Sequence, residues 1–257
     1  MDFIHLIPGV ALPELSPGVL ALGVLAFVLG GLVKGTLGVG LPLVVVPLLS
    51  LGMSSPLAIS LVSVPVLASN AWQAWDSRGP LDHVRRFSPL LLTLLVSTII
   101  TVPLTLALPA GVLNIMLAVA VVTAVLLMAL NPQLNISARH EKIYSAVVGT
   151  LSGIMGGISS LTGPIIITYL MALRLPREAF VGTISIIYLT GAIPLYVAMA
   201  VVGRLGLGEA MLSLLAMVPL MLGMVIGKKL RVHLSEVLFR RSLLVFLSVI
   251  AMALLFK

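Results

Sequence analysis

Residues 31–46 read GLVKGTLGVGLPLVVV, with three glycines in the spacing Gly-x3-Gly-x2-Gly and a proline ahead of an apolar run. Residues 149–168 read GTLSGIMGGISSLTGPIIIT and open with the same glycine spacing, 118 positions later. After a short insertion, Pro164 and its apolar run correspond to Pro42 and its run in the first stretch. Because glycine and proline both disfavour the interior of a helix, the pattern predicts two interrupted helices related by an internal repeat.

Long apolar segments surround both stretches. Of the 257 residues, 60% are hydrophobic and 9% are charged, whereas about 25% of the residues in a soluble domain are charged. A helix of about 20 apolar residues crosses the hydrocarbon core of a bilayer. The composition therefore predicts an all-α, polytopic integral membrane protein. The predicted spans are residues 17–33, 57–75, 88–107, 110–130, 178–202, 209–227 and 238–256.

Residues 34–52 and 143–173 carry the glycine pattern and do not fit that template. Each contains a Gly-rich break and an apolar piece of roughly 11 residues, which at ~1.5 Å per residue reaches about half way across the membrane. We therefore predict broken or re-entrant helices in these two segments.

The basic residues lie in alternate loops between the apolar segments. If the N-terminus is outside, the loops predicted to be inside hold thirteen of the fifteen Lys and Arg residues, and Arg204 and Lys257 are the exceptions. Since cytoplasmic loops are enriched in basic residues, this distribution predicts a multi-pass protein of the inner cell membrane with its basic loops in the cytoplasm. The net charge of +7 does not indicate nucleic-acid binding, because that requires a clustered basic face on a soluble fold.

An odd number of segments in each half makes the second half enter the membrane from the opposite side. With about five segments per half, the sequence predicts two inverted repeats. This is the plan of secondary transporters, whose substrate binds near the midplane where broken helices meet. The predicted boundaries are 1–130 for the N-terminal half, 131–142 for a cytoplasmic linker and 143–257 for the C-terminal half.

The two glycine stretches resemble those of the sulfite exporter TauE/SafE family of membrane transporters. The resemblance rests on Gly31–Pro42 and on Gly149–Gly157, which leads to Gly163, Pro164 and Tyr169. Through the two-half plan it extends over essentially the whole chain. It implies transport of a sulfur-containing anion, such as sulfite or an organosulfonate, across the inner membrane. The chain departs from the family at Val39-Gly40-Leu41, where members often have a denser glycine run, and in the inserted stretch Ser159-Ser160-Leu161-Thr162.

The backbone at the two breaks is the candidate binding site for an anion. A half-helix N-terminus offers free N–H donors and about half a positive charge, and such N-termini are predicted at Leu41 and Pro164. Glycine lets an anion approach the backbone, and hydroxyl side chains add donors. The alternative is that these small residues only permit close helix packing. The candidates at the breaks are Gly38, Gly40, Pro42, Gly156, Gly157, Ser159, Ser160, Thr162, Gly163 and Pro164.

Three further polar residues are candidates for substrate binding at the same site. Lys34 is the basic residue that borders a break, so it either attracts the anion or extends its ammonium group to the cytoplasmic headgroups. Asn70 and Thr190 lie inside apolar segments at roughly corresponding positions of the two halves. They either flank the site or form interhelical hydrogen bonds.

The other ionisable residues argue against different chemistry. The Asp and Glu residues fall in loops or at segment ends, so a carboxylate-based cation site or proton relay has little support, whereas an anionic substrate suits their absence from the spans. The four histidines are far apart and cysteine is absent, so we predict no metal site and no cofactor. The sequence contains neither a P-loop nor a cluster of catalytic residues, so nothing in it indicates an enzyme.

Together these features predict a secondary transporter for a small anion, sulfite or an organosulfonate such as sulfoacetate, that works by alternating access. In this hypothesis the two breaks meet near the midplane and the two halves rock around them. An anion channel lined by the same loops is the alternative. A lipid-modifying enzyme or a scaffold subunit would need a reactive cluster or a docking surface, and the sequence has neither. The predicted partners are the anion and the lipid bilayer, and a homo-oligomer is compatible with the sequence.

Overall fold

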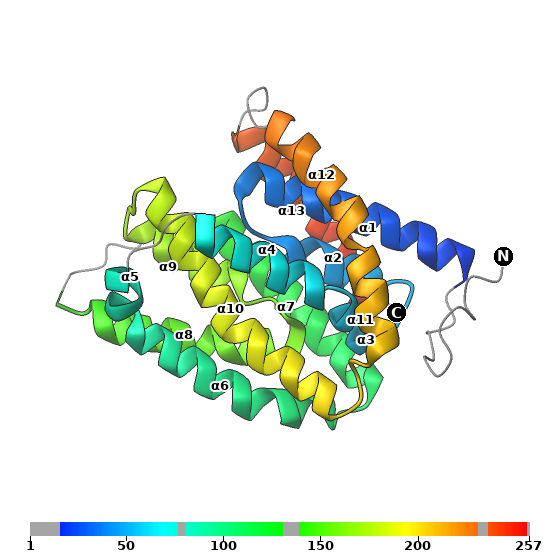
Figure 1. Ribbon diagram of the computed structural model, residues 1–257, viewed down its shortest axis with the longest axis horizontal. Coiled ribbons are helices and arrows are strands. Elements are labelled where there is room, and N and C mark those ends of the chain that lie inside the picture. The colour runs from blue at the N-terminus through cyan, green and yellow to red at the C-terminus, as the bar shows by residue number, and fades with distance from the viewer. Residues whose placement is uncertain (1–15, 77–80, 131–138, 231–235, 256–257) are drawn as a thin grey trace.

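The computed structural model of the chain describes residues 16–76, 81–130, 139–230 and 236–255. Within these ranges the regular elements are helices and no strand occurs, so the all-α prediction is confirmed (Figure 1). The helices are α1 (Pro17–Leu37), α2 (Leu41–Leu49), α3 (Ser55–Leu61), α4 (Ser63–Asp76), α5 (Leu81–Arg86), α6 (Ser88–Leu106), α7 (Ala110–Leu130), α8 (Glu141–Ser159), α9 (Gly163–Ala172), α10 (Arg177–Val201), α11 (Leu207–Leu215), α12 (Met217–Leu230) and α13 (Glu236–Leu255).

Six helical stretches in the described part of the chain are long and apolar enough to cross a bilayer, and they coincide with six of the seven predicted spans. For the seventh, the structure has α13, whose described apolar part is Leu244–Leu254. Polytopic membrane character is therefore confirmed by the length and composition of the helices. The six stretches are Pro17–Leu37, Ser55–Asp76, Ser88–Thr105, Gly111–Leu130, Ala179–Val201 and Leu207–Leu230.

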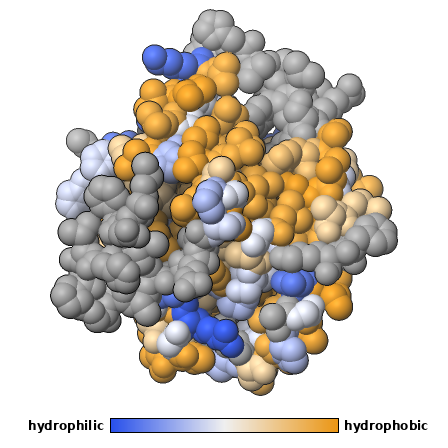
Figure 2. Space-filling model, turned by 90° about the vertical axis from the view of Figure 1, so that its right-hand side faces the viewer, coloured by the Kyte–Doolittle hydropathy of each residue, from blue (hydrophilic) through white to orange (hydrophobic). Residues whose placement is uncertain are grey.

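The outer surface of these helices is apolar. Figure 2 shows hydrophobic residues over much of one face of the molecule. Large aliphatic side chains are exposed on α1, such as Leu20 and Leu25, and on α12, such as Leu222. A soluble protein rarely leaves a continuous apolar surface of this extent open to water. This surface is therefore suited to contact with lipid tails.

The chain folds back after α1. Gly38 and Gly40 have φ angles of 80° and 96°, in the left-handed region that glycine adopts without steric cost. α2 then runs back along α1, and its Leu41 and Val45 side chains pack on Gly30. Farther along, the Leu22 side chain lies against Gly52. We refer to residues 17–49 as the first hairpin.

A second fold-back follows α8. Ser160 has a φ angle of 61° and its backbone N–H donates to the carbonyl of Gly156, so it ends the helix with a left-handed turn. α9 then returns along α8. This is seen at Tyr169 of α9 and Ser145 of α8, whose hydroxyls are 2.6 Å apart. We refer to residues 141–172 as the second hairpin.

Two of the three glycines in each set lie within a helix and not at the break. Gly31 and Gly35 are inside α1, and Gly149 and Gly153 are inside α8. A methyl group at any of these four positions would overlap the adjoining helix, which is α12 for the first pair and α6 for the second. These glycines permit close helix packing, which is the alternative considered above.

Several helix pairings join the two predicted halves. α1 packs on α12, and α8 packs on α6. α4 packs on α10, and α7 packs on α13. Each hairpin thus lies against a helix that belongs to the other half.

An ion pair connects the end of α5 to the start of α8. Arg86, at the end of α5, donates from Nε and Nη2 to the two carboxylate oxygens of Glu141, at 2.6 and 3.0 Å. This bidentate contact raises the pKa of Arg86. The pair ties the start of α6 to the start of α8.

Two predictions concern residues outside the described ranges. The N-terminal tail predicted to be outside the membrane includes residues 1–15, and the predicted linker at 131–142 includes residues 131–138. The linker's remaining part, residues 139–142, comprises a turn and the first residues of α8.

Candidate functional site

The two hairpin tips and the helices α4 and α10 surround one cavity. The first hairpin contributes Gly40, Pro42 and Leu43, and the second contributes the α8–α9 connection. The cavity volume is about 30 Å³, which is enough for one or more water molecules. Segments more than a hundred positions apart in the sequence therefore share a single internal space.

Two helix N-termini open onto this cavity. α2 begins at Leu41 after Gly40, and α9 begins at Gly163 after Thr162. Neither N-cap residue makes a side-chain hydrogen bond to its helix, unlike Ser16, whose hydroxyl accepts from the Val19 N–H of α1. The starts of α2 and α9, where N–H groups lack a side-chain cap and the helix dipoles are positive, therefore lie at the cavity, a setting that favours negative charge.

Asn70 joins the cavity to a buried lysine. Its side chain lines the cavity from α4, and its Oδ1 accepts a hydrogen bond of 2.9 Å from Lys34 Nζ of α1. Lys34 is only 2% exposed, so the interpretation that its ammonium group extends to the headgroups is wrong. Asn70 separates the amine from the cavity, which Lys34 does not itself line.

A second amide on α4 holds the tip of the first hairpin. Gln73 Nε2 donates to the carbonyl oxygen of Gly38 at 3.1 Å. Its Oε1 accepts from the Ser185 hydroxyl of α10 at 3.4 Å. The tip is thus tied to both central helices by one side chain.

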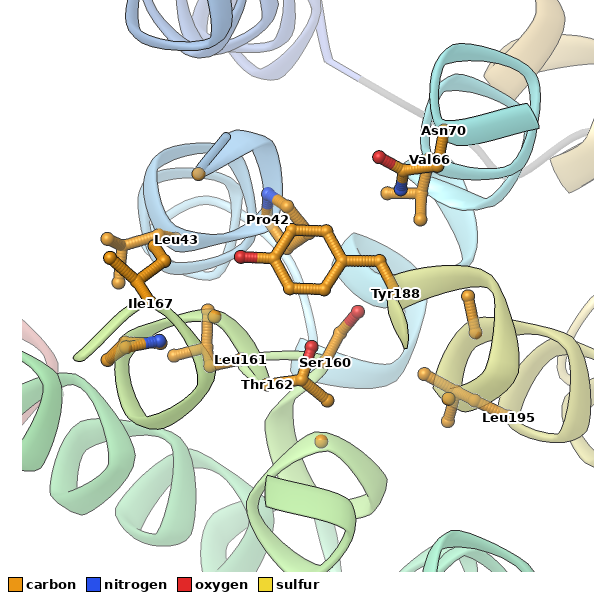
Figure 3. Close-up of a pocket in the computed structure, with 16 residues that line it drawn as sticks. Pro42, Leu43, Val66, Asn70, Ser160, Leu161, Thr162, Ile167, Tyr188 and Leu195 are labelled. Carbon is orange, nitrogen blue, oxygen red and sulfur yellow. The ribbon is translucent and has the colours of Figure 1, made fainter. Parts of the chain in front are cut away.

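Eight of the thirteen predicted substrate-binding residues lie around the cavity, and Figure 3 shows those that it labels pointing toward the central space. They come from the first hairpin, α4 and the second hairpin. They are Gly40, Pro42, Asn70, Gly156, Ser160, Thr162, Gly163 and Pro164.

The other five do not line it; they are Lys34, Gly38, Gly157, Ser159 and Thr190. Gly157 packs against Thr101 of α6, and Gly38 is in contact with Val181 of α10. The hydroxyls of Ser159 and Thr190 donate within their own helices, to the carbonyls of Met155 and Ile186. Gly157, Ser159 and Thr190 are each next to a lining residue in the sequence, but neighbours on a helix point in different directions.

The predicted site residues do not include those that α10 contributes to the cavity. Tyr188, Gly191, Ala192 and Leu195 form one face of that helix. Their spacing of three and four positions is the helical signal that could have grouped them. It is not specific, because every face of an apolar membrane helix shows such a spacing.

Tyr188 is the first residue of this face. The tyrosine is 8% exposed, and its hydroxyl has no hydrogen-bond partner among the described residues. Figure 3 shows its ring across the cavity, near Pro42, Ser160 and Thr162.

Within the described ranges, no three His, Asp or Glu side chains form a group that could hold a metal ion. None of the sixteen residues that line the cavity is an acid. The polar groups of the lining are amide, hydroxyl and backbone groups.

Helices long and apolar enough to cross a bilayer define the class as a polytopic membrane protein, and two of its helices begin at an internal cavity. The chain matches the family model described as sulfite exporter TauE/SafE over residues 22–254, and it belongs to that family. Its members are membrane transporters, so this chain is a membrane transport protein. Comparisons with curated proteins and with solved structures gave no match.

Proposed function

We propose that the chain is a secondary transporter that moves a small sulfur-containing anion, sulfite or an organosulfonate, across the inner membrane by alternating access. The observation that carries the proposal is that the N-termini of α2 and α9 open onto one cavity whose lining contains no acid. Family membership supports a sulfur oxyanion as the substrate.

The electrostatics of the cavity favour an anion over a cation. The uncapped N-termini of α2 and α9 each carry about half a positive charge. Lys34 lies behind Asn70, and its amine donates to an amide oxygen and not to a carboxylate. A cation would meet no carboxylate in the lining, whereas an anion finds backbone N–H and hydroxyl donors.

The helix pairings support inverted repeats as the architecture. The first helix of each half packs on a late helix of the other half, as α1 does on α12 and α8 does on α6. The third segments of the two halves, which end in α4 and α10, pack on each other. This reciprocal pattern is what a two-fold relation between residues 1–130 and 143–257 produces.

The same pairings identify which parts move together in our proposal. The glycines of α1 bring its backbone against α12, and those of α8 bring its backbone against α6. Such close contacts cannot slide without clashes. Each hairpin therefore moves with its partner helix from the other half, and the moving units are these mixed bundles instead of the sequence halves.

Uptake into proteoliposomes tests the proposal. We expect purified protein to accumulate radiolabelled sulfite or sulfoacetate, but not a carboxylate of similar size. Replacing Gly156 with Leu should abolish this uptake, because a side chain at Gly156 projects onto Thr162 at the cavity. The matched control is Gly111→Leu, since nothing lies within 4 Å of a methyl group at that position.

Both variants should insert into membranes in normal amounts. Uptake by Gly156→Leu at the wild-type rate would remove the cavity from the transport path. Single-channel currents in planar bilayers, with a flux far above about 10³ ions per second, would favour the anion channel over the carrier.

A further inference from the structure

We infer that the Tyr188 hydroxyl is a substrate-binding donor that reads an oxygen atom of the transported oxyanion. This inference rests on the proposed function and deepens it by naming a residue that determines specificity. It is carried by three observations, which concern the hydroxyl's missing partner, its position at the start of α9 and the glycine that makes room for it.

The hydroxyl of Tyr188 is buried without a hydrogen-bond partner in the part of the chain that the structure describes. An unpaired hydroxyl in an apolar interior costs free energy, so native structures pair nearly all such groups. By contrast, the Tyr169 hydroxyl is paired with Ser145. Because Tyr188 lines the cavity, a ligand or water there is the partner that the hydroxyl can reach.

The hydroxyl lies at the N-terminus of α9. A methyl group built on Gly163, the first residue of that helix, would be 2.8 Å from the hydroxyl oxygen. The uncapped N–H groups of α9 and the phenolic O–H are therefore neighbouring donors at one point of the cavity. An oxyanion presents several acceptor oxygens on one centre, which suits such a cluster of donors.

Gly163 keeps the position of the hydroxyl open. For a methyl group at residue 163, the next nearest atoms are the Tyr188 ring carbon Cζ at 3.7 Å and Ile167 Cδ1 at 3.8 Å. These are ordinary contacts, so an alanine there would be crowded by the hydroxyl oxygen alone. The requirement for glycine at 163 thus depends on the oxygen of Tyr188.

Binding and transport of sulfite and sulfoacetate by Tyr188→Phe test the inference. Removing one hydrogen bond to a charged group should weaken binding about ten- to a hundredfold. We expect this loss in the KM for uptake, with the maximal rate little changed, and in the ligand concentration needed to raise the melting temperature in detergent. Tyr169→Phe is the matched control, and it should lower the melting temperature without changing the KM.

Gly163→Ala supplies a second, independent test. In the wild-type background it should weaken binding, because the methyl group displaces the hydroxyl. In the Tyr188→Phe background it should add no further loss, because the crowded oxygen is gone. Additive losses in the double variant would contradict the geometry.

The outcomes separate this inference from the proposed function. If Tyr188→Phe binds both anions as the wild type does, the inference is overturned while transport stands. If the wild type is stabilised by the anions but moves none of them, the transport proposal fails while Tyr188 is still tested by binding. If no anion stabilises the wild type, Tyr188 has no oxyanion to read and the inference is overturned.

Discussion

Lys34 is a basic residue that is buried inside the protein. It is 2% exposed and donates to Asn70 at 2.9 Å. Lys34 is in the last turn of α1, and a buried amine without a polar partner costs free energy. Asn70 offsets part of that cost, so the two residues act as one unit that joins α1 to α4.

A double-mutant cycle measures the coupling of Lys34 and Asn70. Asn70→Leu should lower the free energy of unfolding by about 1.5–3 kcal/mol, since it removes a hydrogen bond from a buried ammonium group. Adding Lys34→Met should recover most of this loss, because no polar group remains unpaired. The measurement is thermal unfolding in detergent, and equal, independent effects of the two substitutions would contradict the pairing.

Thr123→Val is a suitable reference for this cycle. The Thr123 hydroxyl donates to the carbonyl of Val119 within its own helix and is exposed. Its loss should change stability by less than about 0.5 kcal/mol.

At the scale of the helices, close packing through glycine determines which helices pair. On α1, Gly31 and Gly35 meet the backbone of α12, and on α12, Gly223 and Gly227 meet the backbone of α1. Two glycines four positions apart on each helix thus form a flat contact. Apolar side chains gain little by leaving lipid, so this steric fit is a main source of pairing energy.

Gly31→Ala tests the importance of that fit. Its methyl group would overlap the carbonyl oxygen of Leu220, and backbone cannot move aside as a long side chain can. We expect a loss of about 1–3 kcal/mol or more and a lower melting temperature in detergent.

The control for this substitution is Gly111→Ala. A methyl group there meets nothing within 4 Å, and alanine favours the helix over glycine by up to about 1 kcal/mol. Stability should therefore be unchanged or slightly higher. A Gly31→Ala protein as stable as Gly111→Ala would show that α1 and α12 need no close approach.

At the scale of the whole molecule, the distribution of charge predicts the direction of insertion. The sequence contains no cysteine, so single introduced cysteines can be labelled without background. Arg139 and Arg204 are both exposed and lie on opposite predicted sides of the membrane. A membrane-impermeant maleimide added to intact cells should label Arg204→Cys and leave Arg139→Cys unlabelled.

Permeabilised cells provide the control, because both cysteines should react there. Labelling of Arg139→Cys alone in intact cells would reverse the predicted orientation. The physical basis is the retention of basic loops in the cytoplasm during insertion.

The extent to which the site was predictable varies by residue. The backbone preferences of glycine and proline predict helix starts at Gly40, Pro42, Gly163 and Pro164. All four residues line the cavity. Gly157 and Ser159 have the same local signals, yet they face α6 and the helix backbone. Tyr188 carries only the general signal of a polar side chain inside an apolar helix, and that signal does not say which surface the side chain faces.

The sequence by itself determined that the chain is an all-α, multi-pass membrane protein of a transporter family, because hydropathy, segment length and motif spacing are properties of neighbouring residues. Only the tertiary structure decided which glycines pack helices and which shape the hairpin tips, that Lys34 is buried against Asn70, and that Tyr188 faces the cavity. These facts depend on which helix surfaces meet. Helices of similar apolar composition offer several faces of nearly equal hydropathy, and steric fit between distant segments selects among them.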